Sequence, residues 1–144
     1  MRVLLDTSVL VGAMVEAHPA HAVALPWLQR VRDGVDVGLV AAHSLAELYA
    51  ILTTLPVQPR IPPAIARQLI GRNILGVCEV VSLSGEDYAA VIDHLSGLGI
   101  IGGATYDALI LHAASKAMAD RVVTLNEQDF RRVYPDLADR ITSP

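Results

Sequence analysis

The sequence predicts an α/β fold in which a central, mostly parallel sheet carries helices on both faces. Two observations lead to this prediction. Short apolar segments typical of strands, such as residues 2–6 and 37–41, alternate along the chain with segments of helical spacing. These strand segments are continuously apolar instead of alternating between polar and apolar residues, which is typical of strands buried on both faces.

The order of the elements follows from local signals. Pro62 and Pro63 are expected to open one helix, Pro56 to end another, and residues 84–87 to begin a third as a capping box. We expect strands at residues 2–6, 37–41, 77–83 and 121–125, with an edge strand near Ile141. We expect helices at about residues 7–15, 20–33, 44–54, 62–75, 84–98, 104–119 and 126–133.

Length and composition restrict the class of protein. The chain has 144 residues, so we expect a single domain over residues 1–144. No apolar stretch is long enough for a membrane span. Asp6 interrupts the first hydrophobic run, so we expect no signal peptide. We therefore expect a cytoplasmic location. Cys78 is the only cysteine, which excludes an intrachain disulfide and a thiolate zinc site. The net charge of −4 argues against a broadly basic nucleic-acid binder but leaves room for an enzyme that meets nucleic acid through a local, metal-bearing patch.

Three acidic residues lie inside apolar segments. Asp6 follows a buried strand, while Glu47 and Asp107 lie on apolar stretches of predicted helices. An unpaired buried carboxylate costs several kcal/mol or shifts its pKa, so such residues need a reason. One acidic cluster that holds Mg²⁺ or Mn²⁺ through oxygen ligands is such a reason.

Each acid also has a simpler explanation. Acidic residues favour the first turn of a helix, where they satisfy free N–H groups and the helix dipole. Residues 44–47 have the form of a capping box, Thr105 could cap the helix that carries Asp107, and Asn126 could cap the last short helix. The capping explanation suits any one acid better than the set, because all three lie on apolar segments.

Four motifs resemble those of PIN-domain ribonucleases, in the same order and over nearly the whole chain. They are residues 4–10 (LLDTSVL), 44–49 (SLAELY), 106–114 (YDALILHAA) and 123–130 (VTLNEQDF). The size is similar to that of VapC-like toxins from type II toxin–antitoxin modules. The resemblance implies a PIN-like three-layer fold and a metal-dependent endoribonuclease with Mg²⁺ or Mn²⁺ as cofactor.

The resemblance also implies roles for individual residues. Asp6, Glu47 and Asp107 would form the catalytic acidic core and bind the metal. The fourth metal-binding position falls on Asn126 or Asp129, and Asp129 is our candidate because it brings a charge. Thr7, Ser8 and Thr124 would orient the carboxylates or a bound water. The expected partners are an RNA substrate, a cognate antitoxin that covers the active site, and a second copy of the chain in a homodimer.

Three alternatives remain at this level. A Mg²⁺-binding receiver-like signalling domain would need a lysine near its acids, whereas Lys116, the only lysine, lies inside a predicted helix. A phosphatase with an Asp nucleophile would need a second Asp where Ser8 stands. A PIN-like fold without catalysis would serve only to bind RNA or protein.

Overall fold

The computed structural model describes all 144 residues and contains one five-stranded sheet. The strands pair in the order β3-β2-β1-β4-β5, and all four pairings are parallel, as the continuous apolar segments predict. The strands are β1 (Arg2–Leu5), β2 (Val37–Ala41), β3 (Cys78–Val81), β4 (Arg121–Val123) and β5 (Ile141–Thr142).

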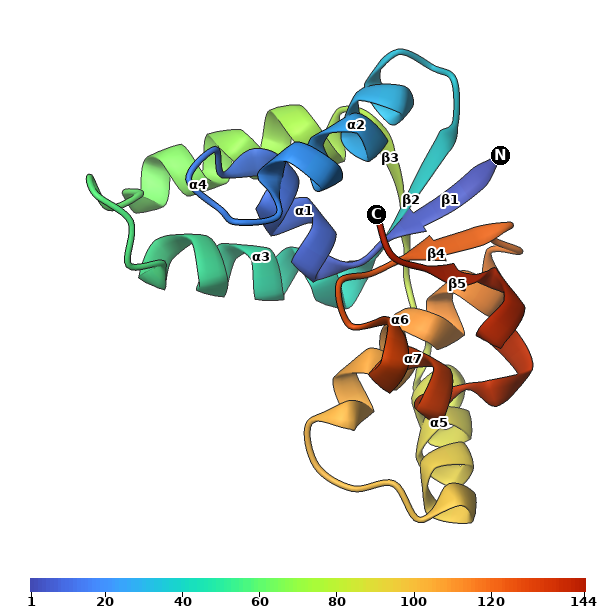
Figure 1. Cartoon of the computed structure of the whole chain (residues 1–144). Helices are drawn as coiled ribbons and strands as arrows, with labels where there is room; N and C mark the ends of the chain where they lie inside the picture. Colours follow the sequence, from blue (N-terminus) through green and yellow to red (C-terminus); the bar gives the residue numbers. More distant parts are fainter.

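Helices cover both faces of this sheet (Figure 1). They are α1 (Thr7–Met14), α2 (His21–Arg32), α3 (Ala42–Thr54), α4 (Pro63–Ile70), which continues into a π-helical turn (Gly71–Leu75), α5 (Gly85–Leu98), α6 (Ala104–Lys116) and α7 (Glu127–Val133), followed by a 3-10 helix (Pro135–Arg140). None of these helices has the length and apolar character that crossing a lipid bilayer requires.

Successive strand residues face opposite layers, which explains the uninterrupted apolar runs. Val3 and Leu5 of β1 pack with α1, α2, α3 and α4 in one buried cluster. Leu4, between them, packs with α5, α6 and α7 in a second cluster on the other face. The molecule therefore has three layers, as the resemblance implies.

Gly38 shows how closely one layer fits the sheet. A Cβ at this position of β2 would overlap the Cγ1 atom of Val31 on α2. A side chain on the strand would force α2 away from the sheet, so the glycine permits the close approach.

The structure confirms one of the predicted helix caps and contradicts two. The capping box at Ser84 is confirmed: the Ser84 hydroxyl accepts from the backbone N–H of Asp87, whose carboxylate accepts from Ser84 N. The capping box at residues 44–47 is wrong, because α3 begins at Ala42 and Ser44 is buried inside it. Thr105 does not cap α6, which begins one residue earlier with Gly103 at its N-cap.

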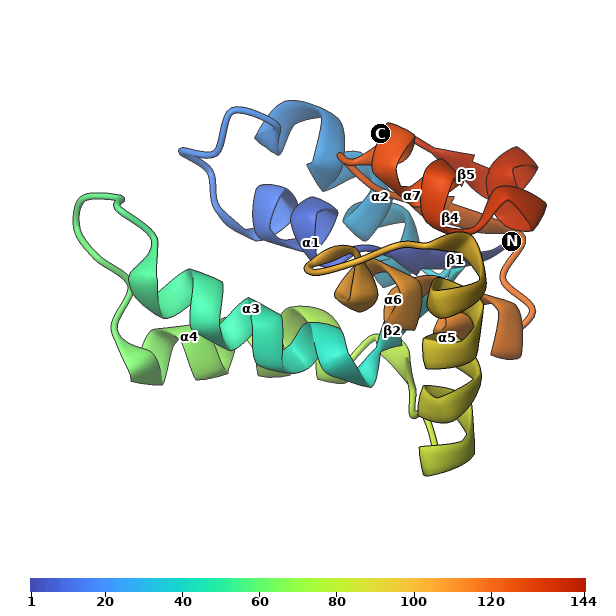
Figure 2. The same ribbon diagram turned by 90° about the horizontal axis from the view of Figure 1, so that it is seen from below.

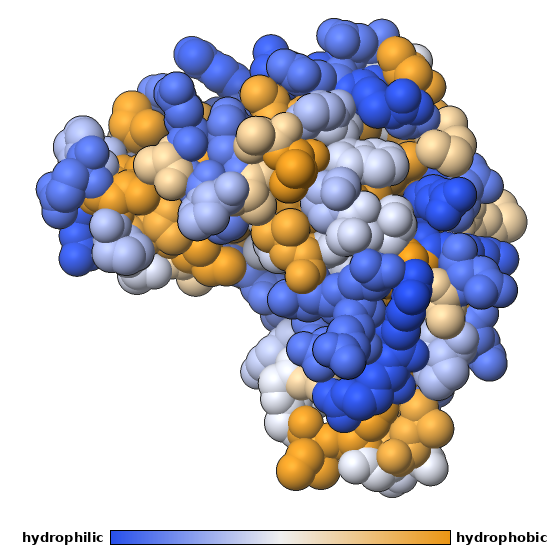
Figure 3. Space-filling view, in the orientation of Figure 1, coloured by the Kyte–Doolittle hydropathy of each residue, from blue (hydrophilic) through white to orange (hydrophobic).

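Two segments give the molecule a bent outline. Helices α3 and α4 run side by side and project beyond the sheet in both ribbon views, and we call residues 42–75 the arm (Figures 1 and 2). The space-filling view shows a concave notch between the arm and the layer of α5 and α6 (Figure 3). The loop from β4 to α7 lies at the inner corner of this notch (Figure 1).

Candidate functional site

The sequence-predicted acids lie around the carboxyl edge of the sheet, where parallel α/β folds bind ligands. Asp6 directly follows β1, and Thr124 directly follows β4, the neighbouring strand. The backbone N–H of Asp6 donates to the carbonyl of Val123 at 3.0 Å, so strand pairing fixes where the Asp6 carboxylate begins. Asp6 is only 3% exposed.

Two hydroxyls hold the Asp6 carboxylate. Ser8 Oγ and Thr124 Oγ1 donate to Asp6 Oδ2 at 2.6 and 2.8 Å. The same hydroxyls accept backbone N–H groups of Leu125 and Asn126, which ties the β4–α7 loop to the acid. Burial raises the pKa of Asp6, although the Ser8 and Thr124 hydrogen bonds act in the opposite direction.

Glu47 reaches the same region from α3. Its Oε1 atom lies 3.1 Å from the Thr7 hydroxyl and 3.5 Å from His43 Nε2. The Thr7 hydroxyl is also 2.9 Å from Ser44 Oγ. Thr7 and Ser44 are buried, so a polar contact between α1 and α3 sets the position of the Glu47 carboxylate.

Asp107 connects the acids electrostatically. It lies in the first turn of α6, where the next turn of the same face, Ile110 and Leu111, is buried. Burial raises the pKa of Asp107 to about 6, with further contributions from the charges of Asp6, Glu47 and Asp129. Arg132 is the cation that opposes this shift. The charges of acids from three other segments therefore reach Asp107.

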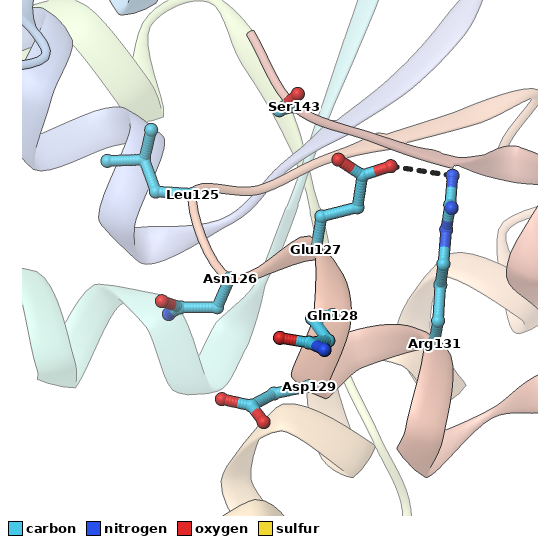
Figure 4. A pocket seen from close by; sticks show the side chains of 7 residues that line it. All are labelled: Leu125, Asn126, Glu127, Gln128, Asp129, Arg131 and Ser143. Atoms are coloured by element: carbon cyan, nitrogen blue, oxygen red, sulfur yellow. Dashed lines mark ion pairs between the residues drawn. The ribbon is translucent and has the colours of Figure 1, made fainter.

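Asn126 and Asp129 lie at the exposed side of this cluster. In Figure 4 both side chains point toward α3 and α6 and away from the ion pair between Glu127 and Arg131, whose Oε1 and Nη2 atoms are 2.6 Å apart. An open hollow of about 570 Å³ lies here; its lining is Leu125, Asn126, Glu127, Gln128, Asp129, Arg131 and Ser143. Of the predicted metal-binding residues, Asn126 and Asp129 line this hollow, whereas Asp6, Glu47 and Asp107 do not.

Helix capping does not account for these acids. Helices α3, α6 and α7 have no side-chain hydrogen bond at their N-caps, so the side chains of Glu47, Asp107 and Asn126 cap none of them. Asp107 and Asp129 still lie in first turns, where the helix dipole favours an acid. The dipole alone leaves the approach of the four acids unexplained.

The only lysine lies away from the acids. Lys116 is the last residue of α6, whereas Asp107 is in its first turn. Lys116 Nζ is 2.6 Å from Asp87 Oδ2. The receiver-like alternative needs a lysine beside the acidic pocket and is therefore wrong.

The donor chemistry of the cluster fits a hard divalent cation, because the donors are carboxylate oxygens with one amide oxygen. No three His, Cys, Asp or Glu side chains are close enough to share one ion directly. Mg²⁺ keeps several of its waters in proteins, so ligation partly through water suits this spacing.

Three neighbours of the cluster are not predicted as site residues by the sequence. His43 precedes Glu47 by one helical turn, and its ring stacks on that of Tyr106, which is adjacent to Asp107. Ser44, the third, has the spacing of a cap. The spacing of His43 from Glu47 and the position of Tyr106 beside Asp107 are signals in the sequence that could have identified both rings.

Comparisons with known proteins show the family of the chain. The family model described as PIN domain matches residues 3–135. The ribonuclease VapC27 of Mycobacterium tuberculosis is 35% identical over 115 residues, which cover 80% of this chain and 78% of that protein.

Solved structures share the fold. A structure of VapBC2 from Rickettsia felis, bound to a DNA fragment from their promoter, superposes with a TM-score of 0.69 at 21% identity and covers 100% of this chain and 99% of the other. The Mycobacterium tuberculosis toxin VapC20, described as cleaving the sarcin-ricin loop, gives a TM-score of 0.64 at 15% identity over 83% and 86% of the two chains.

Proposed function

The chain belongs to the PIN domain family and is a ribonuclease of the VapC kind, and we propose that it hydrolyses RNA phosphodiester bonds at the cluster of Asp6, Glu47 and Asp107. The observation that carries this proposal is the arrangement of Asp6, Glu47 and Asp107, which come from three separate segments and lie around the carboxyl edge of the sheet, near enough for the charges of Asp6 and Glu47 to raise the pKa of Asp107. Burial raises the pKa of Asp107 most, the charges of Asp6, Glu47 and Asp129 raise it further, and the charge of Arg132 opposes them. A fold keeps such a cluster when a cation or a reaction uses it.

The residues of the cluster have different roles in the reaction. A water oxygen attacks the phosphorus, the bond from phosphorus to the 3′ oxygen breaks, and that oxygen takes a proton from solvent water, so the products carry a 5′-phosphate and a 3′-hydroxyl. Glu47, held by Thr7 and His43, takes the proton from the attacking water. Ser8 and Thr124 keep Asp6 in one orientation.

We propose Mg²⁺ or Mn²⁺ as the cofactor. Asp6, Glu47 and Asp107 would hold the ion together, at least one of them through a bound water. When bound, a divalent ion lowers the pKa of a coordinated water and polarises the phosphate. It also offsets the repulsion that raises the pKa of Asp107.

Asp129 is our candidate for the fourth acidic position. Its charge reaches Asp107 and raises the pKa of that carboxyl, whereas Asn126 has no charge to contribute. Both side chains point toward α3 and α6 (Figure 4), so Asn126 remains a source of a neutral oxygen ligand. Loss of metal affinity in Asp129→Asn, but not in Asn126→Ala, would assign the position to Asp129.

The decisive experiment incubates the partner-free protein with a structured RNA mixture and either Mg²⁺ or Mn²⁺. Its comparisons are an EDTA reaction, the variant Asp107→Asn, and the matched control Asp136→Asn. Asp136 is an exposed acid on the 3-10 helix, outside the cluster. We expect cleavage with the metal, in the wild type and in Asp136→Asn only.

Other outcomes would contradict the proposal. Equal cleavage by Asp107→Asn would place the chemistry elsewhere. No cleavage of any RNA, together with no metal binding in calorimetry, would favour a PIN-like fold that only binds RNA or protein.

We also propose an antitoxin partner that covers the acids and presents a basic side chain to them. The negative charges that meet at Asp107 support this complementarity. An apolar hollow of about 550 Å³ on the arm supports a protein partner; it is lined by Tyr49, Pro63, Ala64, Arg67, Ile70 and Leu75. Binding of a candidate antitoxin should stop RNA cleavage and weaken when its basic residue is replaced.

Finally, we propose a homodimer. A surface on α5 and the loop after it could form an apolar contact with a second copy of the chain. Its exposed apolar side chains are Ile92, Leu98 and Ile101, and Ile101 is 87% exposed. Size-exclusion chromatography with light scattering should show a dimer that Ile101→Asp weakens. A strict monomer at high concentration would contradict it.

A further inference from the structure

Two rings stack beside the acid cluster. The imidazole of His43 and the ring of Tyr106 are parallel to within 2°, with their centroids 5.1 Å apart. His43 lies on α3 and Tyr106 on α6, the two helices that carry Glu47 and Asp107. The stack therefore bridges the helices where their acids approach each other.

One side of this stack remains open. Tyr106 is 52% exposed, although His43 covers one face of its ring. The side chain of His43 is itself only 23% exposed. Aromatic residues make up just 4% of the chain, so few rings are available for exposed positions.

The stack is joined to the groups proposed to react. His43 Nε2 lies 3.5 Å from Glu47 Oε1, and Tyr106 directly precedes Asp107 in the first turn of α6. A flat group lying on the open face of Tyr106 would therefore be held next to the acids.

The charge of the site makes such a contact valuable. RNA phosphates are negative, and the side-chain charges that reach Asp107 from Asp6, Glu47 and Asp129 are negative too, with Arg132 as an opposing cation. A ring that stacks on a base provides affinity without charge, and every unpaired base has a flat face to offer.

We propose that Tyr106, backed by His43, is a base-stacking platform that binds one unpaired nucleobase of the RNA strand next to the phosphate to be cleaved. This inference rests on the proposed function. It makes Tyr106 a substrate-binding residue and His43 a positioning residue, which holds the Tyr106 ring and contacts Glu47. The platform would favour single-stranded or looped RNA over duplex, because paired bases are stacked within the helix.

The first test compares cleavage by the wild type, Tyr106→Leu and Tyr106→Phe on a single-stranded RNA. Leucine keeps apolar bulk but removes the ring, so KM should rise about 5- to 100-fold, with a smaller change in kcat. Phenylalanine keeps the ring and should restore most of the loss. Tyr88→Leu, which removes a 43% exposed tyrosine from α5, is the matched control.

The second test does not depend on cleavage. In an Asp6→Asn background, a short RNA that carries fluorescent 2-aminopurine is titrated with protein that has or lacks Tyr106. Stacking on the ring should quench the fluorescence, and Tyr106→Leu should abolish the quenching and weaken binding. A duplex of the same sequence should show no dependence on Tyr106.

The outcomes separate the two proposals. If Tyr106→Leu binds and cleaves single-stranded RNA like the wild type, the platform is overturned while the ribonuclease function stands. The platform is also overturned if the variant only lowers Tm, because the stack would then merely link α3 to α6. If the wild type cleaves no RNA but quenching still requires Tyr106, the proposed function fails, and of the platform proposal only the stacking of a base on Tyr106 stands.

Discussion

Asp6 and Asp36 are both buried, and they lie at opposite edges of the same sheet. Asp6 follows β1 at the carboxyl edge, and burial raises its pKa. Asp36 precedes β2 at the other edge, where Arg30 Nε is 2.6 Å and the terminal ammonium of Met1 is 3.0 Å from its carboxylate. The hydrogen bond from Arg30 is the largest reason why the pKa of Asp36 is lowered.

The difference lies in what surrounds each carboxylate. Asp36 has two cationic partners, so its charge contributes to the stability of the fold. Asp6 has only neutral hydroxyls, and the acids near it raise the pKa of Asp107 still further. We infer that the carboxyl edge gives up stability for a site that binds and reacts, and that the opposite edge supports the fold.

The largest expected effect comes from Asp6→Asn. The variant should lower the rate of RNA cleavage by roughly 10²- to 10⁴-fold, in the range of lost acid–base groups. Its Tm should stay the same or rise, because a neutral amide replaces a buried, uncompensated charge. Single-turnover cleavage and thermal unfolding measure the two quantities. A lower Tm with normal cleavage would show that Asp6 stabilises the fold and takes no part in the reaction.

Asp36→Asn should do the opposite. Removing the charge that Arg30 and the terminus share should lower the free energy of unfolding by about 1–3 kcal/mol. Cleavage per folded molecule should not change. Urea unfolding measures the loss, and Asp33→Asn is the control, an exposed acid expected to shift stability by less than about 0.5 kcal/mol. Equal stability of the Asp36 and Asp33 variants would show that the ion pairs contribute nothing.

The smallest effect is a pair of opposite pH dependences in the metal-free protein. The pKa of Asp36 is lowered, so its contribution to stability is present above its ordinary pKa and is lost as the pH falls through the folded value. The pKa of Asp107 is raised from 3.8 to about 6, so its contribution is present below pH 4 and is lost as the pH rises to 6.

Urea unfolding in EDTA between pH 4 and 7 tests the Asp107 half of this prediction. The wild type should lose stability across pH 4 to 6 relative to Asp107→Asn. Since Asp107 is only half-buried, the slope of this difference should stay below about 1.4 kcal/mol per pH unit, the value for one proton. Parallel curves for the two proteins would show that neither burial nor the neighbouring acids raise the pKa of Asp107 in solution.

Local sequence patterns were enough to predict most of the strands and helices and the parallel sheet. The apolar run before Asp6 predicts a buried strand, and the structure has β1 at Arg2–Leu5. Alternating strands and helices without polar interruptions predict a parallel sheet, and parallel strands bring their carboxyl ends to one edge. The predicted strand ends extend too far, since Leu125 belongs to a loop that the Ser8 hydroxyl holds.

Capping is where local reasoning failed. Ser44 has the spacing of an N-cap relative to Glu47, but α3 begins two residues earlier and buries Ser44 against Thr7. A hydroxyl can form a hydrogen bond to a side chain far away in the sequence as well as to a nearby backbone N–H, and burial selects between them. The spacing of residues in the sequence does not indicate which of the two partners is used.

The sequence by itself determined the order of the elements, the parallel sheet and the placing of Asp6 and Thr124 at strand ends, because these depend on local periodicity and on strand direction. Only the tertiary structure decided which charges meet. Arg30 reaches Asp36, Lys116 reaches Asp87, and no lysine reaches the acids at the carboxyl edge. The same holds for the stack of His43 on Tyr106, since contacts between distant segments depend on how the helices pack across the sheet.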